Sequence, residues 1–306
     1  MTIIQLEYLL AVANYGNYSA AAKHCFVTQP SLSMQINNLE EELGVILLDR
    51  NSKPIVPTET GVLVLEQAKE AVAAFYSTKE KVSGLKGELS GKLRLGIIPT
   101  ISPYLLPKFF PKFIKRCPKV ELEIRDMFTA DIIDFLSRDL IDVAILAGGD
   151  PIRIKEINLF DDKLYFYVSP KSEWYHHTHV AIDEVDIKHV AMLSEGNCMR
   201  NQVLKSLCLN KKAFKSQYNF VNCSLDTLMH FVDINDSAIT IIPSMAIDYI
   251  PKERLGQIKP FAKANAHRKI TMSVGRTYVK ELIVKAVKDS LMEVSKELAI
   301  ANFVRS

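Results

Sequence analysis

Two cysteines ten residues apart are the side chains best suited to carry chemistry in this sequence. Cys198 stands where a loop runs into an expected helix, and Arg200 follows two residues later. A thiol at a helix N-terminus beside an arginine has a stabilised thiolate, and the thiolate is the reactive form of cysteine. Cys208 lies between two leucines, which is typical of a buried thiol at rest. The pattern predicts one reactive and one protected cysteine.

The spacing of these two cysteines limits how they can react with each other. If 199–208 is helical, ten residues span about 15 Å at about 1.5 Å per residue. A disulfide needs its Cα atoms within about 7 Å. Bonding Cys198 to Cys208 would therefore unwind and repack the segment, which would turn a local oxidation into a change of the whole domain. On spacing alone, two unconnected buried thiols remain the alternative interpretation.

Length and composition set the class of protein. The 306 residues suggest two or three domains, and the net charge of +3 is too small to imply nucleic acid by itself. The odd total of five cysteines argues against a disulfide scaffold, and Cys25, Cys117 and Cys223 are expected as small buried hydrophobes. The sequence has no apolar run of about 18 residues and no basic leader, so we expect a cytoplasmic protein without a membrane span.

No motif of a metal, cofactor or enzyme site is found. The sequence has no Walker loop, Gly-x-Ser-x-Gly elbow or Rossmann fingerprint. His176, His177 and His179 fall in a polar loop without a spaced cysteine or aspartate partner, so a solvated loop is expected there. The prediction is a protein that holds no metal and no cofactor and is not an enzyme.

The first 58 residues predict three short helices and a β-wing. Apolar residues recur at three- and four-residue spacing over 6–13, as an amphipathic helix requires. Ser19 is a good cap for a short second helix, and Thr28 for a third helix that stops at Gly44. Residues 45–57 are expected as two short extended pieces around a turn. This order of elements predicts a winged helix-turn-helix.

The third helix and the wing carry the expected DNA contacts. In a winged helix-turn-helix the third helix enters the major groove with its N-terminal residues against base edges. Its polar residues suit bases and phosphates, and two basic residues of the wing suit phosphates. The predicted contacts are Thr28, Gln29, Pro30, Ser31, Ser33, Gln35, Arg50 and Lys53. Three basic and five acidic side chains give residues 1–58 a net charge of −2, which is unusual for a lone DNA-binding domain. From the residues alone, a helical protein-interaction module remains the alternative.

A long helix is expected after Thr58, which suits its N-cap. Apolar residues follow at spacings of three, four and seven, with Lys79 as a defect, and form a weak heptad seam. The predicted dimerisation residues are Leu65, Ala68, Val72, Phe75 and Val82. The alternative is a helix lying on the surface of its own domain.

From residue 92 the pattern changes to alternating strands and helices, which predicts a parallel sheet. We expect strands at 93–98, 120–124, 142–146, 164–168, 189–193, 217–221, 238–242 and 270–274. The length fits two small α/β lobes around a cleft, with the chain crossing between them twice. The predicted fold is α + α/β: a winged helix-turn-helix over 1–58, a linker and dimerisation helix over 59–88, and a two-lobed, periplasmic-binding-protein-like effector domain. Lobe I covers 89–163 and 269–306, and lobe II, which would sense redox state, covers 164–268.

The N-terminal motifs resemble the signature of LysR-type transcriptional regulators. The matching residues are Ser19-Ala20-Ala21-Ala22, Thr28-Gln29-Pro30-Ser31-Leu32-Ser33, Ile36, Leu39-Glu40, Leu43-Gly44, Arg50, Thr58 and Gly61. The resemblance implies double-stranded DNA as partner, a homotetramer built as a dimer of dimers, and a two-lobed effector domain.

The effector half is most similar to the OxyR branch of that family, which senses hydrogen peroxide. The similarity rests on Gly96-Ile97-Ile98-Pro99-Thr100, Pro103-Tyr104-Leu105-Leu106-Pro107, Leu159-Phe160-Asp161 and residues 195–202. It implies that Cys198 is oxidised to a sulfenic acid and Cys208 resolves it to a disulfide. It implies a peroxide pocket of Thr100, Thr129, Asn197 and Arg200, RNA polymerase as a partner, and a thiol reductant such as glutaredoxin or thioredoxin.

Two departures accompany this resemblance. Asn197 stands where the branch usually has histidine, and the two cysteines are ten apart rather than nine. The function predicted is a LysR-type regulator that controls oxidative-stress genes through thiol–disulfide switching. The first alternative is a LysR-type regulator that responds to a small organic anion bound between the lobes. The second is a thiol peroxidase enzyme, against which the DNA-binding module argues.

Overall fold

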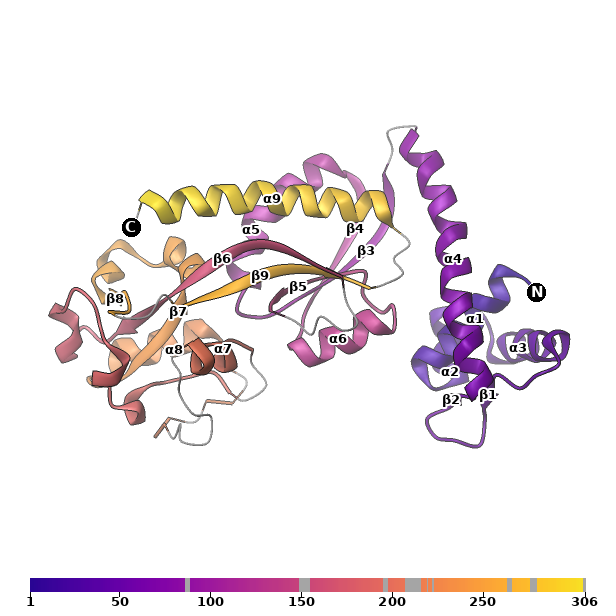
Figure 1. Cartoon of the computed structure of the whole chain (residues 1–306), viewed down its shortest axis with the longest axis horizontal. Helices are drawn as coiled ribbons and strands as arrows, with labels where there is room; N and C mark the ends of the chain where they lie inside the picture. The colour runs from indigo at the N-terminus through magenta and orange to yellow at the C-terminus, as the bar shows by residue number, and fades with distance from the viewer. Residues whose placement is uncertain are drawn as a thin grey trace. The chain divides into compact units, whose positions relative to one another are not determined.

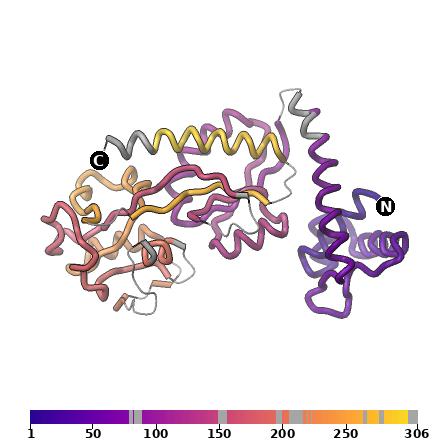
Figure 2. The backbone as a smooth tube through the Cα atoms, viewed as in Figure 1, coloured from indigo at the N-terminus to yellow at the C-terminus, as the bar shows by residue number. Residues whose placement is uncertain are grey.

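The computed structural model describes residues 1–85, 89–148, 155–194, 198–206, 216–218, 220–221, 223–262, 266–275 and 280–304. The chain divides into two compact units. One is Met1–Leu89 with Thr277–Leu282, and the other is Ser90–Arg276 with Ile283–Ser306. In Figure 1 the first unit is indigo to violet, and most of the second runs from magenta to yellow. Figure 2 traces the same backbone as a tube.

The first unit is the expected winged helix-turn-helix followed by a long helix. Strands β1 and β2 pair antiparallel as the wing. The elements are α1 (Ile3–Tyr15), α2 (Tyr18–His24), α3 (Gln29–Leu43), β1 (Leu48–Asp49), β2 (Val56–Pro57) and α4 (Glu59–Leu85).

Local signals explain most of these boundaries. The Thr28 hydroxyl accepts from the Ser31 backbone at the start of α3, and Gly44 ends that helix in the left-handed region at φ 68°. The prediction that Ser19 caps the second helix is wrong. Asn17 caps it instead, with its side chain accepting from the Ala20 backbone at 3.0 Å. Asparagine is as good a cap as serine, and this one directly follows the turn that ends α1, so α2 starts earlier.

The core of this unit comes from the apolar stripes of its helices and the start of the wing. Leu9, Val12, Leu32, Ile36 and Leu39 are fully buried, as helical periodicity predicts. Leu47 and Leu48 close the core from the wing side, and residues of α4 complete it. Burial of these side chains fixes α3 with its polar face outward.

The second unit is the α/β part. Its main elements are β3 (Ser90–Ile97), α5 (Ser102–Arg116), β4 (Lys119–Asp126), α6 (Thr129–Ser137), β5 (Val143–Ala147), β6 (Lys155–Val168), α7 (Cys198–Ser206), α8 (Leu225–Ile234), β7 (Ile239–Pro243), β8 (Ile258–Lys259), β9 (His267–Val274) and α9 (Glu281–Val304). Among the described residues between β6 and β8, five short 3-10 helices occur, at Glu173–His176, Ile182–Glu184, Ile187–His189, Ser244–Tyr249 and Lys252–Gln257.

The strands run in the order β4-β3-β5-β9-β6-β7, with β8 also paired to β6. β3 pairs parallel with β4 and β5, whereas β9 is antiparallel to β5 and β6. β6 pairs with β9 along residues 155–163 and with β7 along 164–168, so this one strand joins the two lobes. In Figure 1 β6 and β9 run together as two long arrows from one lobe into the other. The two-lobed α/β prediction is confirmed.

Two expected strands are absent from the described part of this region. Residues 189–193 form no strand, and only Val190 makes an isolated bridge, to Ile239 of β7. The described residues among 217–221 also have no strand pairing. Residues 190–193 are buried, but within the described part of the chain only the backbone N–H of Ala191 among them donates to a strand, to the Ile239 carbonyl of β7. Gln217 and Val221 are exposed, so β propensity alone was not enough at either place.

Helices α5 and α9 are held to each other by side-chain pairs. Lys112 lies 2.6 Å from Glu297, and Arg116 lies 2.5 Å from Glu293 and 2.7 Å from the Ser290 hydroxyl. The C-terminal helix therefore belongs to lobe I, although it is last in the sequence. Figure 1 shows α9 in yellow along α5.

Candidate DNA interface and redox-sensing site

The N-terminus of α3 presents the predicted base-reading residues. Thr28, Gln29 and Pro30 are exposed, and Ser31, Ser33 and Gln35 are half-buried. The buried apolar stripe of the same helix faces the core, so the polar side chains are left on the outer face. The Ser19 hydroxyl lies 3.5 Å from the Gln29 amide oxygen, which links α2 to the N-terminal end of α3.

The wing residue Arg50 is already paired within the chain. Its guanidinium lies 2.5 Å from one Glu40 carboxylate oxygen and also donates to Asn37. The other Glu40 oxygen accepts from the backbone N–H groups of Leu47 and Leu48 at 2.7 and 3.2 Å. Glu40 therefore connects the wing to α3, and Arg50 lies against the side of that helix. Lys53 is exposed on the wing, and both residues remain predicted phosphate contacts.

The predicted dimerisation residues fall into two groups on α4. Leu65 and Ala68 are buried in the core of the first unit, and Val72 packs partly against that core. Phe75 and Val82 are 40% and 52% exposed. All five residues lie at helical spacing, but α1 covers the first half of this seam. Phe75 and Val82 are therefore the members that remain available for the predicted dimer contact.

In the effector domain, Thr100 is held by a buried ion pair. The Arg268 guanidinium donates from Nη1 to the Thr100 hydroxyl at 2.8 Å and from Nη2 to the Thr100 carbonyl at 3.0 Å. Its Nε donates to Asp162 at 2.9 Å, and both charged side chains are fully buried. The Ser244 hydroxyl and the Met245 N–H also donate to Asp162. A buried ion pair of this kind is tolerated because the two charges meet directly and are joined by further hydrogen bonds.

Thr129 lies at the same edge of the sheet as Thr100. Thr100 follows β3 and Thr129 opens α6 after β4, and the carboxyl ends of parallel strands meet at one edge. The Thr129 hydroxyl oxygen is buried, and no partner for it is found within the described part of the chain. An unpaired buried hydroxyl is uncommon and marks a place where a small polar molecule can bind.

Helix α7 joins this edge from lobe II. It spans Cys198–Ser206, so Cys198 is its first residue. One turn later, the Gln202 amide donates to the carbonyl of Ala147, the last residue of β5. β5 is the neighbour of β3, so the start of α7 is brought to the edge that carries Thr100 and Thr129. Asn197 and Cys208 lie outside the described residues.

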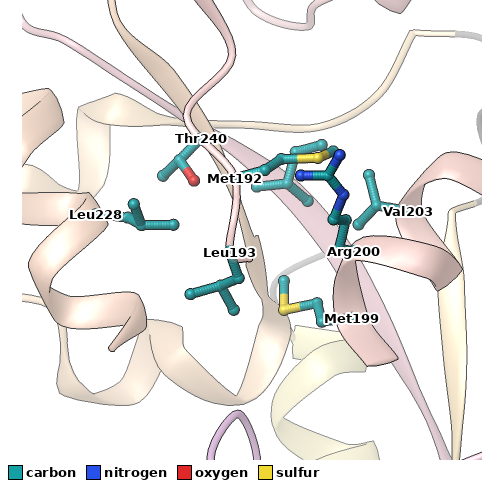
Figure 3. A pocket seen from close by; sticks show the side chains of 8 residues that line it. Met192, Leu193, Met199, Arg200, Val203, Leu228 and Thr240 are labelled. Carbon is teal, nitrogen blue, oxygen red and sulfur yellow. The ribbon is translucent and has the colours of Figure 1, made fainter. Parts of the chain in front are cut away.

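A small pocket lies beside α7 within lobe II. It has about 10 Å³ of space, enough for about one water-sized molecule. Figure 3 shows Met199, Arg200 and Val203 of α7 on one side and Leu228 and Thr240 on the other. Met192, Leu193 and Ile241 complete the lining. A water-sized space is therefore left where α7 packs against the rest of lobe II.

The other cysteines are in unreactive environments. Burial raises the pKa of the Cys25, Cys117 and Cys223 thiols above their ordinary value. Cys117 is buried, and Cys25 and Cys223 are half-buried, so the prediction of full burial holds for Cys117 alone. None of these three is in a disulfide. Among the described residues, no group of three histidine, cysteine or acidic side chains is arranged to hold a metal ion.

Arg268, Asp162 and Gln202 were not among the site residues that the sequence predicted. Arg268 and Asp162 are 106 positions apart, and only the pairing of β6 with β9 brings them together. Arg268 stands in the basic run His267-Arg268-Lys269 just before the expected strand at 270–274, and nothing in that run marks it as the buried member. Gln202 lies within the stretch 195–202 that carries the family resemblance, but its partner is a backbone carbonyl, which no pattern reveals.

These features define a class: regulators that bind DNA through a winged helix-turn-helix and carry a two-lobed α/β effector domain. Residues 3–62 match the family model of the bacterial regulatory helix-turn-helix protein, lysR family, and residues 86–295 match that of the LysR substrate binding domain. The chain belongs to the LysR family of transcription regulators, within its OxyR branch of hydrogen peroxide-inducible genes activators.

The relatives support that placement. The chain is 35% identical to the hydrogen peroxide-inducible genes activator of Dickeya chrysanthemi, over 83% of this chain and 82% of the relative. It is 34% identical to the DNA-binding transcriptional dual regulator OxyR of Escherichia coli, over the same shares of the two chains.

Solved structures are similar over nearly the whole length. A full-length OxyR variant from Pseudomonas aeruginosa matches with a TM-score of 0.77 at 25% identity, covering 95% of this chain and 94% of that one. A hydrogen peroxide-bound OxyR mutant from Corynebacterium glutamicum matches with a TM-score of 0.62 at 25% identity, covering 98% and 95%. In the part of this chain that the structure describes, no helix is both long and apolar enough to cross a bilayer.

Proposed function

We propose that this regulator senses hydrogen peroxide through Cys198 and Cys208 and changes transcription from the DNA sites that it binds. The observation that carries the proposal is the hydrogen bond from Gln202 to Ala147. It brings the helix that begins at Cys198 to the sheet edge where Thr100 and Thr129 lie. The approach of this helix to an edge that carries two hydroxyl groups supports a site for a small polar oxidant at the proposed reactive cysteine.

The chemistry balances without a metal or cofactor. The Cys198 thiolate attacks one oxygen of hydrogen peroxide, and the O–O bond breaks. The leaving hydroxide takes a proton and departs as water, while Cys198 becomes a sulfenic acid. The Cys208 thiol then attacks the sulfenic sulfur, and a second water leaves as the disulfide forms. Peroxide is reduced, and the two thiols are oxidised by two electrons.

The Thr100 hydroxyl can donate its proton in a hydrogen bond to the oxidant. Its hydroxyl oxygen accepts from Arg268, so its own proton is left for another acceptor. Thr129 offers a second buried hydroxyl without a partner within the described residues. Arg200, two residues into α7, stabilises the thiolate, as does the helix N-terminus. Asn197 is the remaining member of the proposed pocket.

Formation of the disulfide remodels α7. The helix runs through Ser206, so its Cα atoms from residue 198 to residue 206 span about 12 Å at about 1.5 Å per residue. Bringing Cys208 to Cys198 is therefore expected to unwind at least the last turn of this helix. The repacked lobe II then alters how a tetramer, built as a dimer of dimers, contacts DNA and RNA polymerase in the cytoplasm. A thiol reductant such as glutaredoxin or thioredoxin restores the reduced state.

The test is cysteine connectivity after brief exposure of the full chain to low-dose peroxide, read by mass spectrometry of tryptic peptides. We expect a Cys198–Cys208 disulfide and a changed DNA footprint. Cys198→Ser should abolish both, and Cys223→Ser, the matched control on another thiol of the same lobe, should keep both. An unchanged peroxide response in Cys198→Ser would overturn the switch and favour the small-organic-anion alternative. Multiple turnover of peroxide with a thiol reductant, without an effect on DNA, would instead identify a peroxidase.

A further inference from the structure

Phe26 combines two unfavourable properties in the turn between α2 and α3. Its φ is +56°, in the left-handed region that bulky residues rarely adopt. Its surface is 95% exposed, so burial of the ring offsets none of that strain. An aromatic residue that is both strained and uncovered does not serve the fold of the isolated chain, and an outlier of this kind points to function.

The turn itself explains why the backbone is left-handed there. The Phe26 N–H donates to the Lys23 carbonyl, and the Val27 N–H donates to the Ala22 carbonyl at 3.0 Å. These two bonds are the Schellman motif that ends a helix, and its left-handed position usually holds glycine. Val27 supplies the apolar contact of the motif, since it packs against the core. The turn therefore needs a left-handed residue at position 26, but it does not need a ring.

The ring lies next to the helix end that reads DNA. Two residues after Phe26 comes Thr28, the cap of α3, and then Gln29 and Pro30, all exposed. Met34, one turn into α3 from Pro30, is 55% exposed on the same outer face. Pro30 and Met34 lie one turn apart on α3, so exposed apolar groups interrupt the polar surface of this helix close to Phe26 in the chain.

We propose that Phe26 is a specificity-determining DNA contact whose ring packs against a thymine methyl group in the major groove. Apolar side chains, phenylalanine among them, read thymine through this methyl group. The contact also suits a domain with a net charge of −2 over residues 1–58, which depends less on phosphate attraction than a basic domain does. The inference rests on α3 being the DNA-reading helix, as set out above.

The test uses the full chain and a duplex that it selects from a randomised DNA library. Phe26→Gly is the main variant, because glycine fits the left-handed turn, and Phe26→Asn is the second, because asparagine tolerates it. Both variants should unfold at a Tm no lower than that of the unaltered chain. Both should bind the selected duplex about five- to tenfold more weakly, with the slope of affinity against salt unchanged, since no phosphate contact is lost. Ile234→Ala, which truncates an 80% exposed apolar residue of the other unit, is the control and should bind normally.

Replacing thymine by uracil in the same duplex identifies the contact. The unaltered chain should lose about five- to tenfold in affinity, and Phe26→Gly should lose about twofold or less, because the partner of the methyl group is already gone. An equal loss in both proteins overturns the thymine contact. A lower Tm in Phe26→Gly would show that the ring stabilises the fold. A changed molecular mass of this variant in light scattering would show that the ring contacts a second copy of the chain. Either result would overturn the inference. If both Gln29→Ala and Phe26→Gly bind the selected duplex normally, α3 is not the helix that reads DNA. If only Phe26→Gly binds normally, the thymine contact of Phe26 is contradicted and the role of α3 stands.

Discussion

Arg268 holds Thr100 at two points, with its guanidinium donating to the hydroxyl at 2.8 Å and to the backbone carbonyl at 3.0 Å. The same guanidinium is paired with Asp162 on β6, and neither charge reaches solvent. The sheet edge proposed to receive peroxide is therefore fixed by a charged group from β9, next to the strand that joins the lobes.

We expect Arg268→Met to destabilise the chain by about 3–5 kcal/mol, because it leaves the buried Asp162 carboxylate without its counter-charge. The double variant Arg268→Met/Asp162→Asn should recover part of that loss. Arg138→Met removes an exposed pair with Asp134 and should have little effect. Urea unfolding measures all three, and equal losses for Arg268→Met and Arg138→Met would contradict the buried pair.

Thr100→Val should preserve the fold and slow the oxidation of Cys198 at least tenfold, since the hydroxyl proposed to donate to peroxide is removed. The rate is measured by trapping the sulfenic acid in a Cys208→Ser background, where it cannot be resolved. Thr227→Val, on an exposed hydroxyl at the start of α8, is the control and should react at the unaltered rate. Equal rates in the two threonine variants would remove Thr100 from the pocket.

Oxidation should lower the hydrogen-exchange protection of residues 199–206, because α7 has to unwind to bring Cys208 to Cys198. Exchange across 196–212 in the reduced and oxidised chains measures this change. In Cys208→Ser, peroxide should leave the protection nearly as in the reduced state, since no disulfide forms. Identical protection in both states of the unaltered chain, with the disulfide confirmed, would refute the unwinding.

The two kinds of predicted DNA contact should be separable. Gln29→Ala and Ser33→Ala should reduce the ratio of specific to nonspecific affinity, because they remove base contacts. Arg50→Ala should weaken binding to all sequences and lower the salt slope by about 1, because it removes a phosphate contact. Fluorescence anisotropy over a salt series tests both. An unchanged specificity ratio in Gln29→Ala would mean that α3 docks differently.

Phe75→Glu and Val82→Glu should reduce assembly without unfolding the chain, since both side chains are exposed on α4. Leu65→Ala should instead destabilise the first unit by about 2–5 kcal/mol, because Leu65 is part of its core. Light scattering together with thermal unfolding separates the two effects. A normal oligomer in both glutamate variants would place the partner contact elsewhere.

The contact between α1 and α4 should give a signature at high pH. The hydrogen bond to Glu7, burial and the Glu7 charge raise the pKa of Tyr76 from 10.0 to about 12. Because the pKa is raised in the folded chain, this stabilisation is complete below about pH 10 and is lost as the pH rises towards 12. The tyrosinate absorbance of the unaltered chain minus that of Tyr76→Phe should show this late titration. A difference spectrum that titrates near 10 would show that the contact does not form in solution.

The sequence by itself determined the local features of this protein. Periodicity and capping residues such as Thr28 and Gly44 set the helices of the first unit, because these signals act within a few residues of chain. The same holds for the start of α7 at Cys198. The residue types of the proposed base contacts and redox pair were likewise readable, since their chemistry is intrinsic to the side chain.

Only the tertiary structure decided which distant residues meet. The pairing of β6 with β9 puts Arg268 beside Asp162 and Thr100, and the packing of α7 puts Gln202 on the end of β5. The covering of α4 by α1 divides one helical seam into a buried half and an exposed half. Periodicity reports which face of a helix is apolar, but whether its own chain or a partner buries that face depends on long-range packing. Long-range packing also decides the exposure of Phe26, because the neighbouring elements leave its ring uncovered. Its left-handed backbone is imposed by the turn between α2 and α3.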